Sequence, residues 1–253
     1  YILKGEGEEV FEPQFTYHGA RYCLVLGLTD GQATEELLTF DICASAIGDR
    51  GDFRCSDETV NKLQAMTRNS DLSNFFYFPT DCPHREKNGW TGDASVSCEQ
   101  LSLNFAPEKS YKEWLRNIRK TQKETGELPG IIPTGGWGYE WGNGPAWDQV
   151  ATVLPYMTYL LRGDREIFEE NSPMIMRYAE YISRNRTARG TVELGLGDWC
   201  PVTKFKSPLE FTDSVVCMDI LDKAAYIFSV LGQPLQEKFC VKLRREILSL
   251  IHI

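Results

Sequence analysis

Several common sequence features are missing or rare, and each absence narrows the class of protein. No run of apolar residues approaches the roughly 18 that a membrane-spanning helix needs, so no span is predicted. Only three His are present and the eight Cys contain no Cys-x-x-Cys pair, so we expect no metal and no cofactor. The cysteines are scattered singly, which is typical of separate thiols rather than a disulfide framework and favours a reducing compartment.

Positive charge is also scarce: 27 Lys and Arg stand against 36 Asp and Glu, which gives a formal net charge of −9. A nucleic-acid partner calls for a basic surface, so that class of partner is not expected. Hydrophobic residues at 42% and charged residues at 25% are ordinary for a soluble globular protein. Aromatic residues are generous, with six Trp, and suit stacking on a neutral ring such as a sugar. Cytoplasm and periplasm both stay open, as does the oligomeric state.

Residues 1–50 have the pattern of β-strands. Three short segments rich in β-formers, residues 10–17, 21–28 and 37–43, are separated by turn signals. Several strands at this spacing predict part of a β-sandwich domain, followed by a Gly-containing linker over residues 46–56. We therefore expect one unit over residues 1–50 and a second over residues 51–253.

From Ser56 onward the apolar spacing changes to that of helices. A helix capped at Ser56 carries Val60, Leu63 and Met66. Further helices are predicted after Asp93, from Pro107 to near Gly126, and over residues 150–161, 167–182, 212–231 and 234–247. Two long irregular segments, 126–147 and 190–200, interrupt them, and such loops in a compact domain are usually functional. About seven helices joined alternately by short turns and long loops are typical of a ring of paired helices.

The most charged stretch is residues 80–93, which place three acids, an Arg and a Trp within fourteen positions. Its Pro and two Gly argue against a regular helix or strand. Acids packed this closely perturb one another's pKa values, which is common at functional sites. A structural explanation is equally available: Asp81 could cap a turn, Asp93 could cap the next helix, and Arg85 and Glu86 could form a surface ion pair.

The string Asp-Cys-Pro-x-Arg-Glu-Lys-x-Gly-Trp-Thr-Gly-Asp over residues 81–93 resembles the active-site signature of bacterial α-L-rhamnosidases, glycoside hydrolase family 78. Residues 133–148, residues 197–199 and, before the helices, residues 4–13 also resemble this family. The resemblance implies a mainly α fold: a partial (α/α)6 toroid of six-hairpin type, preceded by strands of a β-sandwich domain. About half of the ring would be present.

The resemblance also implies roles for individual residues. Glu86 matches the general acid, which must be protonated to deliver a proton to the leaving oxygen, and the flanking Asp81 and Asp93 would favour that form. An apolar wall beside hydroxyl-binding acids would suit L-rhamnose, which carries a methyl group at C6. The substrate-binding residues implied are Asp81, Arg85, Trp90, Asp93, Trp147, Asp148, Asp198 and Trp199.

Structural alternatives accompany several of these residues. Arg85 could neutralise a carboxylate so that the loop folds, and Trp90 could be a core anchor. Trp137 and Trp141 could pack within their loop as readily as they could face a sugar. Asp198 could be a turn residue.

Members of the family invert configuration, which requires a second carboxylate as general base. That Glu belongs to the later half of the barrel, and Glu140, the one loop acid considered as a substitute, has nothing in its favour. We therefore expect a rhamnoside-cleaving parent protein, acting on a rhamnose-containing oligosaccharide or glycoside, and an inactive isolated chain. The alternatives are a toroidal glycosidase for another sugar, a non-catalytic carbohydrate-binding protein, and an inactive fragment.

Both ends of the chain have the pattern of a fragment. The sequence opens without Met, and residues 248–253 read as the in-frame translation of a transposon-end sequencing adapter. We therefore expect an internal piece of a longer protein whose last six residues are adapter-derived.

Overall fold

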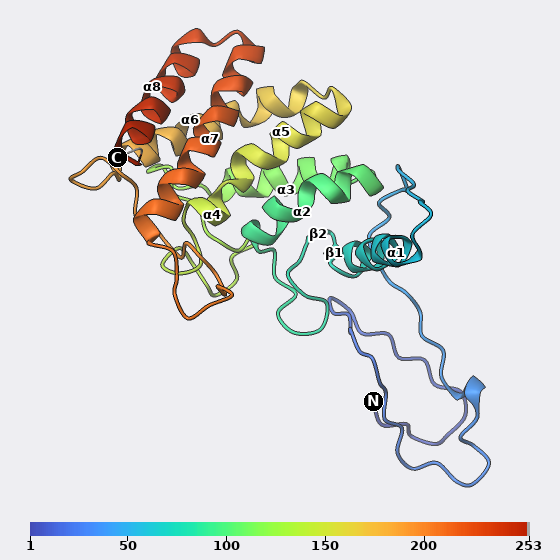
Figure 1. Cartoon of the computed structure of the whole chain (residues 1–253). Coiled ribbons are helices and arrows are strands. Elements are labelled where there is room, and N and C mark those ends of the chain that lie inside the picture. Colours follow the sequence, from blue (N-terminus) through green and yellow to red (C-terminus); the bar gives the residue numbers. More distant parts are fainter. Residues whose placement is uncertain (252–253) are drawn as a thin grey trace.

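The computed structural model describes residues 1–251, so His252 and Ile253 of the expected adapter tail lie outside the described part. Residues 58–251 are mainly helical and contain one short hairpin (Figure 1). The elements are η1 (Glu35–Leu37), α1 (Glu58–Ser73), β1 (Phe75–Phe76), β2 (Phe78–Pro79), α2 (Thr91–Asn104), α3 (Glu108–Thr121), α4 (Pro145–Asp148), α5 (Val150–Arg162), α6 (Glu166–Arg184), α7 (Leu209–Leu231) and α8 (Pro234–Ile251).

The strands expected over residues 10–17, 21–28 and 37–43 are not formed. Residues 1–46 follow an extended, irregular path away from the helices, interrupted by η1 alone, and nearly all of their side chains are exposed (Figure 1). A strand needs a neighbouring strand to pair its backbone groups, and within residues 1–251 this segment has none. The domain boundary placed at residue 50 stays a prediction.

The helices form where the apolar spacing placed them. Tyr111, Leu115 and Ile118 are buried on one face of α3, as predicted. The cap of α1 is Asp57 rather than Ser56, because Asp57 Oδ1 accepts the Thr59 N–H at 2.7 Å. Helices α5 and α7 end at glycines with a left-handed backbone, which is the common way to close a helix.

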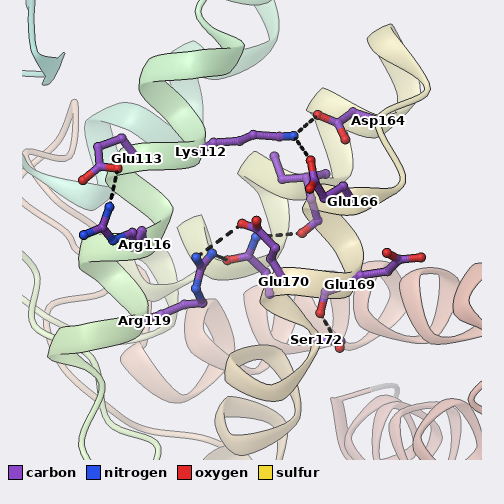
Figure 2. Close-up of polar contacts among 11 residues, drawn as sticks. Lys112, Glu113, Arg116, Arg119, Asp164, Glu166, Glu169, Glu170 and Ser172 are labelled. Atoms are coloured by element: carbon purple, nitrogen blue, oxygen red, sulfur yellow. Dashed lines mark hydrogen bonds and ion pairs between the residues drawn. The ribbon is translucent and has the colours of Figure 1, made fainter.

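Helices α5 to α8 pack on one another in chain order, and α2 lies against α5 (Figure 1). One continuous apolar core runs through these helices and α3, with Trp114, Tyr178, Phe168 and Phe228 among its largest fully buried side chains. Ion pairs and hydrogen bonds join α3 to α6 and to the residues just before it (Figure 2). The packing is that of successive helical hairpins, and the long loops between them build the candidate site.

Candidate active site

The acidic loop, residues 80–90, is fixed by its own backbone. The Asp81 N–H donates to the Asn88 carbonyl at 3.1 Å, and the Asn88 N–H donates back to Asp81 Oδ1 at 2.9 Å. Beyond this closure, the Ile132 N–H donates to the Gly89 carbonyl at 2.9 Å. A Cβ at residue 89 would lie 2.2 Å from Ile132 O, so only glycine lets the two loops approach this closely.

A pocket of about 260 Å³ lies between the acidic loop and two later segments, residues 137–147 and 196–199. It is lined by Asp81, Cys82, Arg85, Glu86, Trp90, Asp93, Trp137, Trp141, Trp147, Leu196 and Trp199. Seven predicted site residues therefore meet around one cavity: Asp81, Arg85, Glu86, Trp90, Asp93, Trp147 and Trp199. The remaining two, Asp148 and Asp198, do not line it.

Glu86 has one carboxylate oxygen engaged and its side chain open to the pocket. The indole N–H of Trp90 donates to Glu86 Oε2 at 2.8 Å, and the Glu86 backbone N–H points at Cys82 Sγ at 3.2 Å. The Cys82 thiol in turn lies 2.8 Å from Asp81 Oδ2. These contacts orient the Glu86 carboxyl while leaving it accessible to a ligand.

Asp93 lies in the first turn of α2 and faces the same cavity. The surrounding protein displaces water and so raises the pKa of Asp93, and the negative charges of Asp81 and Glu86 raise it further. Hydrogen bonding by its own backbone N–H acts in the opposite direction. The pocket therefore contains a carboxyl group that holds its proton more tightly than a free aspartate, next to two further acids.

Five of the six tryptophans form a connected aromatic wall. Trp90 packs edge-on to Trp141, with ring centroids 5.6 Å apart, and Trp137 stacks on Trp141 at 5.4 Å. Trp199 packs edge-on to both Trp141 and Trp147, at 6.1 and 6.4 Å. Flat indole faces beside carboxyl groups match the two kinds of surface on a sugar, C–H bonds and hydroxyl groups.

Trp147 and its neighbour Asp148 face different surroundings, because successive residues of a helical turn point in different directions. Trp147 closes the pocket against Gly92, where a Cβ would lie 2.8 Å from the indole ring. Asp148 is buried in the core and accepts the Tyr178 hydroxyl at 2.8 Å. Burial raises the pKa of Asp148 well above its ordinary value. Direct substrate contact, predicted for Asp148, does not fit this location.

The neighbouring residues Asp198 and Trp199 also lie in different surroundings. Trp199 lines the pocket and is more than half exposed, whereas Asp198 Oδ2 accepts the Ser207 N–H at 3.0 Å and closes its own loop. The turn-forming alternative for Asp198 therefore agrees with the structure. Glu140 lies outside the pocket lining as well.

Four residues of the lining, Cys82, Trp137, Trp141 and Leu196, are not among the predicted site residues. The sequence allows loop packing and the pocket equally for Trp137 and Trp141; in the structure they stack on each other within the wall. Cys82 lies inside the recognised motif, so its position was the available signal, whereas nothing in the sequence distinguishes Leu196. Arg85 lines the pocket and, within residues 1–251, forms no ion pair, so the charge-neutralising alternative finds no partner.

Residues 1–251 lack two features, a metal-binding cluster and a membrane-spanning helix. Residues 1–251 contain no cluster of three or more His, Cys, Asp or Glu able to hold a metal ion. None of their helices combines the length and apolarity needed to cross a membrane.

Paired helices whose long loops gather acids and tryptophans around one pocket have the architecture of the six-hairpin glycosidase class. Residues 48–252 match the family model described as the bacterial alpha-L-rhamnosidase six-hairpin glycosidase domain, and residues 1–46 match the bacterial alpha-L-rhamnosidase concanavalin-like domain. The chain belongs to this bacterial alpha-L-rhamnosidase family, and its helices form part of an (α/α)6 toroid, which confirms the predicted family and fold class.

Curated relatives carry the same name. An alpha-L-rhamnosidase of Formosa agariphila is 32% identical over 249 residues, covering 92% of this chain and 25% of the relative. One from Streptomyces avermitilis is 28% identical over 235 residues, covering 92% of this chain and 22% of the relative. The chain thus spans about a quarter of the length of these relatives.

Solved structures agree in fold. An alpha-L-rhamnosidase from Dictyoglumus thermophilum superposes with a TM-score of 0.76 at 30% identity, covering 81% of this chain and 24% of its own. The Streptomyces avermitilis enzyme, crystallised with L-rhamnose, gives a TM-score of 0.74 at 22% identity, covering 81% and 20%. At 22% identity, the second similarity supports the fold alone.

Proposed function

We propose that the protein carrying this chain hydrolyses terminal α-L-rhamnosyl residues from a rhamnose-containing oligosaccharide or glycoside, with inversion of configuration. One observation carries the proposal: Asp81, Glu86 and Asp93 converge on a pocket walled by five tryptophans. Membership of the alpha-L-rhamnosidase family supplies the sugar. Breaking a glycosidic bond requires a proton donor at the leaving oxygen, and an acid beside a sugar-sized aromatic pocket is placed for that task.

In this proposal Glu86 is the general acid. Trp90 donates its indole N–H to Oε2, so the transferable proton resides on Oε1 and faces the pocket. Asp81 and Asp93 hold sugar hydroxyl groups, whose O–H donates to the carboxylate oxygens. Arg85 adds a fixed positive charge at the rim. The indole faces cover the C–H bonds and the methyl group of the deoxysugar.

Inversion requires a base that activates water on the opposite face of the ring. The three pocket acids all belong to one loop and the first turn of the helix after it, so they approach the sugar from one side. The base is therefore assigned to a part of the protein outside residues 1–251. On this account the isolated chain lacks turnover, although it retains half of the catalytic apparatus.

The test is hydrolysis of an aryl α-L-rhamnoside by the protein that carries this chain, by its Glu86→Gln variant and by residues 1–253 alone. We expect Glu86→Gln to lower turnover by about 10²- to 10⁴-fold. L-rhamnose binding should meanwhile stay within about threefold. The isolated chain should show no turnover, and the first sugar released, followed by NMR, should be the β-anomer.

Glu140→Gln is the matched control, since this loop acid lies outside the pocket, and it should leave turnover unchanged. Equal turnover by Glu86→Gln and the unchanged protein would exclude Glu86 as the acid. L-rhamnose binding without hydrolysis of any aryl glycoside would favour the carbohydrate-binding alternative. Faster cleavage of a different aryl glycoside would favour another sugar.

A further inference from the structure

The segment that carries the last part of the aromatic wall is attached to helix α7 by two buried polar side chains. The Leu194 N–H donates to Asp213 Oδ2 at 2.6 Å, and the Val192 N–H donates to Ser214 Oγ at 3.0 Å. Asp213, Ser214 and Val192 are completely inaccessible to solvent. Water therefore cannot take over these bonds when one partner is removed.

The other side of this segment rests on the loop that precedes Trp147. The Leu196 N–H donates to the Asn143 carbonyl at 3.1 Å, and Gly195 packs directly on Asn143 and Gly144. A Cβ at Gly195 would lie 1.9 Å from the Asn143 oxygen. Residues 192–196 are thus held between α7 and the loop that leads into α4, and this loop carries Trp141 of the pocket wall. We call residues 192–196, together with Asp213 and Ser214, the clamp.

The clamp ends at the pocket residue Leu196, and the pocket residue Trp199 follows it closely in the chain. Trp199 is 56% exposed, so burial alone does not hold its ring in place. Its position depends on its edge contacts with Trp141 and Trp147 and on the path of the backbone that precedes it. The geometry of this side of the pocket is therefore set largely by residues 192–196.

Asp213 differs from the other members of the clamp because it carries a titratable group. Burial raises the pKa of Asp213 to about 7; the Leu194 N–H acts in the opposite direction, and the neighbouring Glu193 raises the pKa further. Asp148 on α4 and Cys217 on α7 are the other titratable groups that feel its charge, and Tyr178 on α6 binds Asp148. Within residues 1–251, Asp213 Oδ1 has no hydrogen-bond partner.

We propose that Asp213 is a positioning residue: by holding the Leu194 N–H from inside the core, it sets the Leu196 and Trp199 side of the sugar pocket. The expected effect on sugar binding rests on the proposed function, whereas the expected effect on residues 192–196 rests on the clamp geometry alone. An ionised carboxylate accepts a hydrogen bond more strongly than a neutral one. The clamp is consequently tighter above pH 7 than below it, and affinity for the sugar follows.

The test compares Asp213→Asn, which keeps a neutral acceptor of the same shape, with Asp213→Ala, which removes the acceptor, in the protein that carries this chain. Amide hydrogen exchange of residues 192–199 reports on the clamp without any ligand. Calorimetric titration with L-rhamnose between pH 5.5 and 8.5 reports on the pocket. Cys217→Ala is the control, since it disturbs the buried face of α7 one turn from Asp213 without touching the clamp.

We expect Asp213→Ala to lose exchange protection over residues 192–199 and to bind L-rhamnose about tenfold more weakly at pH 8. The unchanged protein should bind several-fold more tightly at pH 8 than at pH 6, and Asp213→Asn should lose that pH step. Cys217→Ala should keep both the protection and the step.

Unaltered protection in both Asp213 variants overturns the clamp, and altered protection with unaltered binding overturns its role in the pocket. Absence of rhamnose binding and turnover in the unchanged protein is instead a failure of the proposed function; the exchange data still decide whether the clamp exists.

Discussion

Trp90 links the acid of the site to its aromatic wall. Its indole N–H holds Glu86 Oε2, and its ring packs edge-on to Trp141, with the two centroids 5.6 Å apart. The approach is close because residue 142 is glycine: a Cβ there would lie 2.6 Å from the Trp90 ring, and the backbone has a φ of +80°. Orientation of the acid and closure of the wall therefore depend on the same side chain.

Gly92 allows a comparable close approach beneath Trp147, and Gly92→Ala tests it. Alanine has a higher helix propensity than glycine, so the first turn of α2 itself should tolerate the change. The new methyl group would lie 2.8 Å from the indole, so Trp147 must move out of the pocket. We expect L-rhamnose to bind about tenfold more weakly, measured by calorimetric titration.

Gly136→Ala is the control for this substitution. Residue 136 belongs to the aromatic loop, and no atom lies within 4 Å of a Cβ built there. Its affinity for L-rhamnose should equal that of the unchanged protein. Equal affinity in Gly92→Ala would mean that Trp147 does not shape the sugar-binding wall.

At the scale of elements, the contact between α3 and α6 shows how surface and buried polar groups differ in their contribution to stability. Lys112 pairs with Asp164 at 2.8 Å and Glu166 at 2.7 Å (Figure 2). Arg119 donates to Asn171 Oδ1 at 2.8 Å. Asn171 is fully buried, and its amide group also donates to the Ile167 carbonyl. Arg119 is therefore the partner that satisfies an oxygen inside the interface.

Arg119→Ala should lower the free energy of unfolding by about 1–3 kcal/mol, because it leaves the Asn171 oxygen buried without a donor. Urea denaturation measures this change. Arg116→Ala on the same helix is the control, since Arg116 pairs with Glu113 on the exposed surface (Figure 2) and such pairs contribute about 0–1 kcal/mol. Equal losses for the two variants would contradict the argument from burial.

At the scale of the whole molecule, several buried acids make stability depend on pH. Desolvation raises the pKa values of Asp71, Asp148 and Asp213, so the folded chain holds these protons more tightly than the unfolded chain does. Their contribution to stability is complete below the ordinary Asp pKa of about 4. It is lost as the pH rises through the folded value, which for Asp213 is about 7.

Asp213→Asn should therefore unfold at a higher urea concentration than the unchanged protein at pH 8. The expected gain is about 1–4 kcal/mol, because the variant no longer buries a charge there. The gain should vanish near pH 4, where the Asp213 carboxyl of the unchanged protein is protonated. Asp219→Asn, an exposed acid on the same helix, is the control and should give no gain. A pH-independent difference between Asp213→Asn and the unchanged protein would refute the titration argument.

The whole chain also exposes apolar surface on its first helix and on the segment before it. Leu63 and Met66 of α1 are 60% and 67% exposed, and Phe15 and Ile42 are open to solvent. The periodic spacing in α1 correctly predicted a helix, but the expected apolar side does not face the described core. The helical secondary structure followed from local spacing, while burial depended on which neighbours lie beside it.

The sequence by itself determined the family, the helical fold class and the loop that carries Asp81, Glu86 and Asp93, because motifs and apolar periodicity are local properties of the chain. Only the tertiary structure decided which residues adjacent in sequence face the same environment. It separated Trp147 from Asp148 and Trp199 from Asp198, and it brought Leu196 to the pocket. It also left residues 1–46 without strands. Side-chain direction, close glycine contacts and strand pairing all depend on segments far apart in the chain, and local patterns carry no record of where those segments lie.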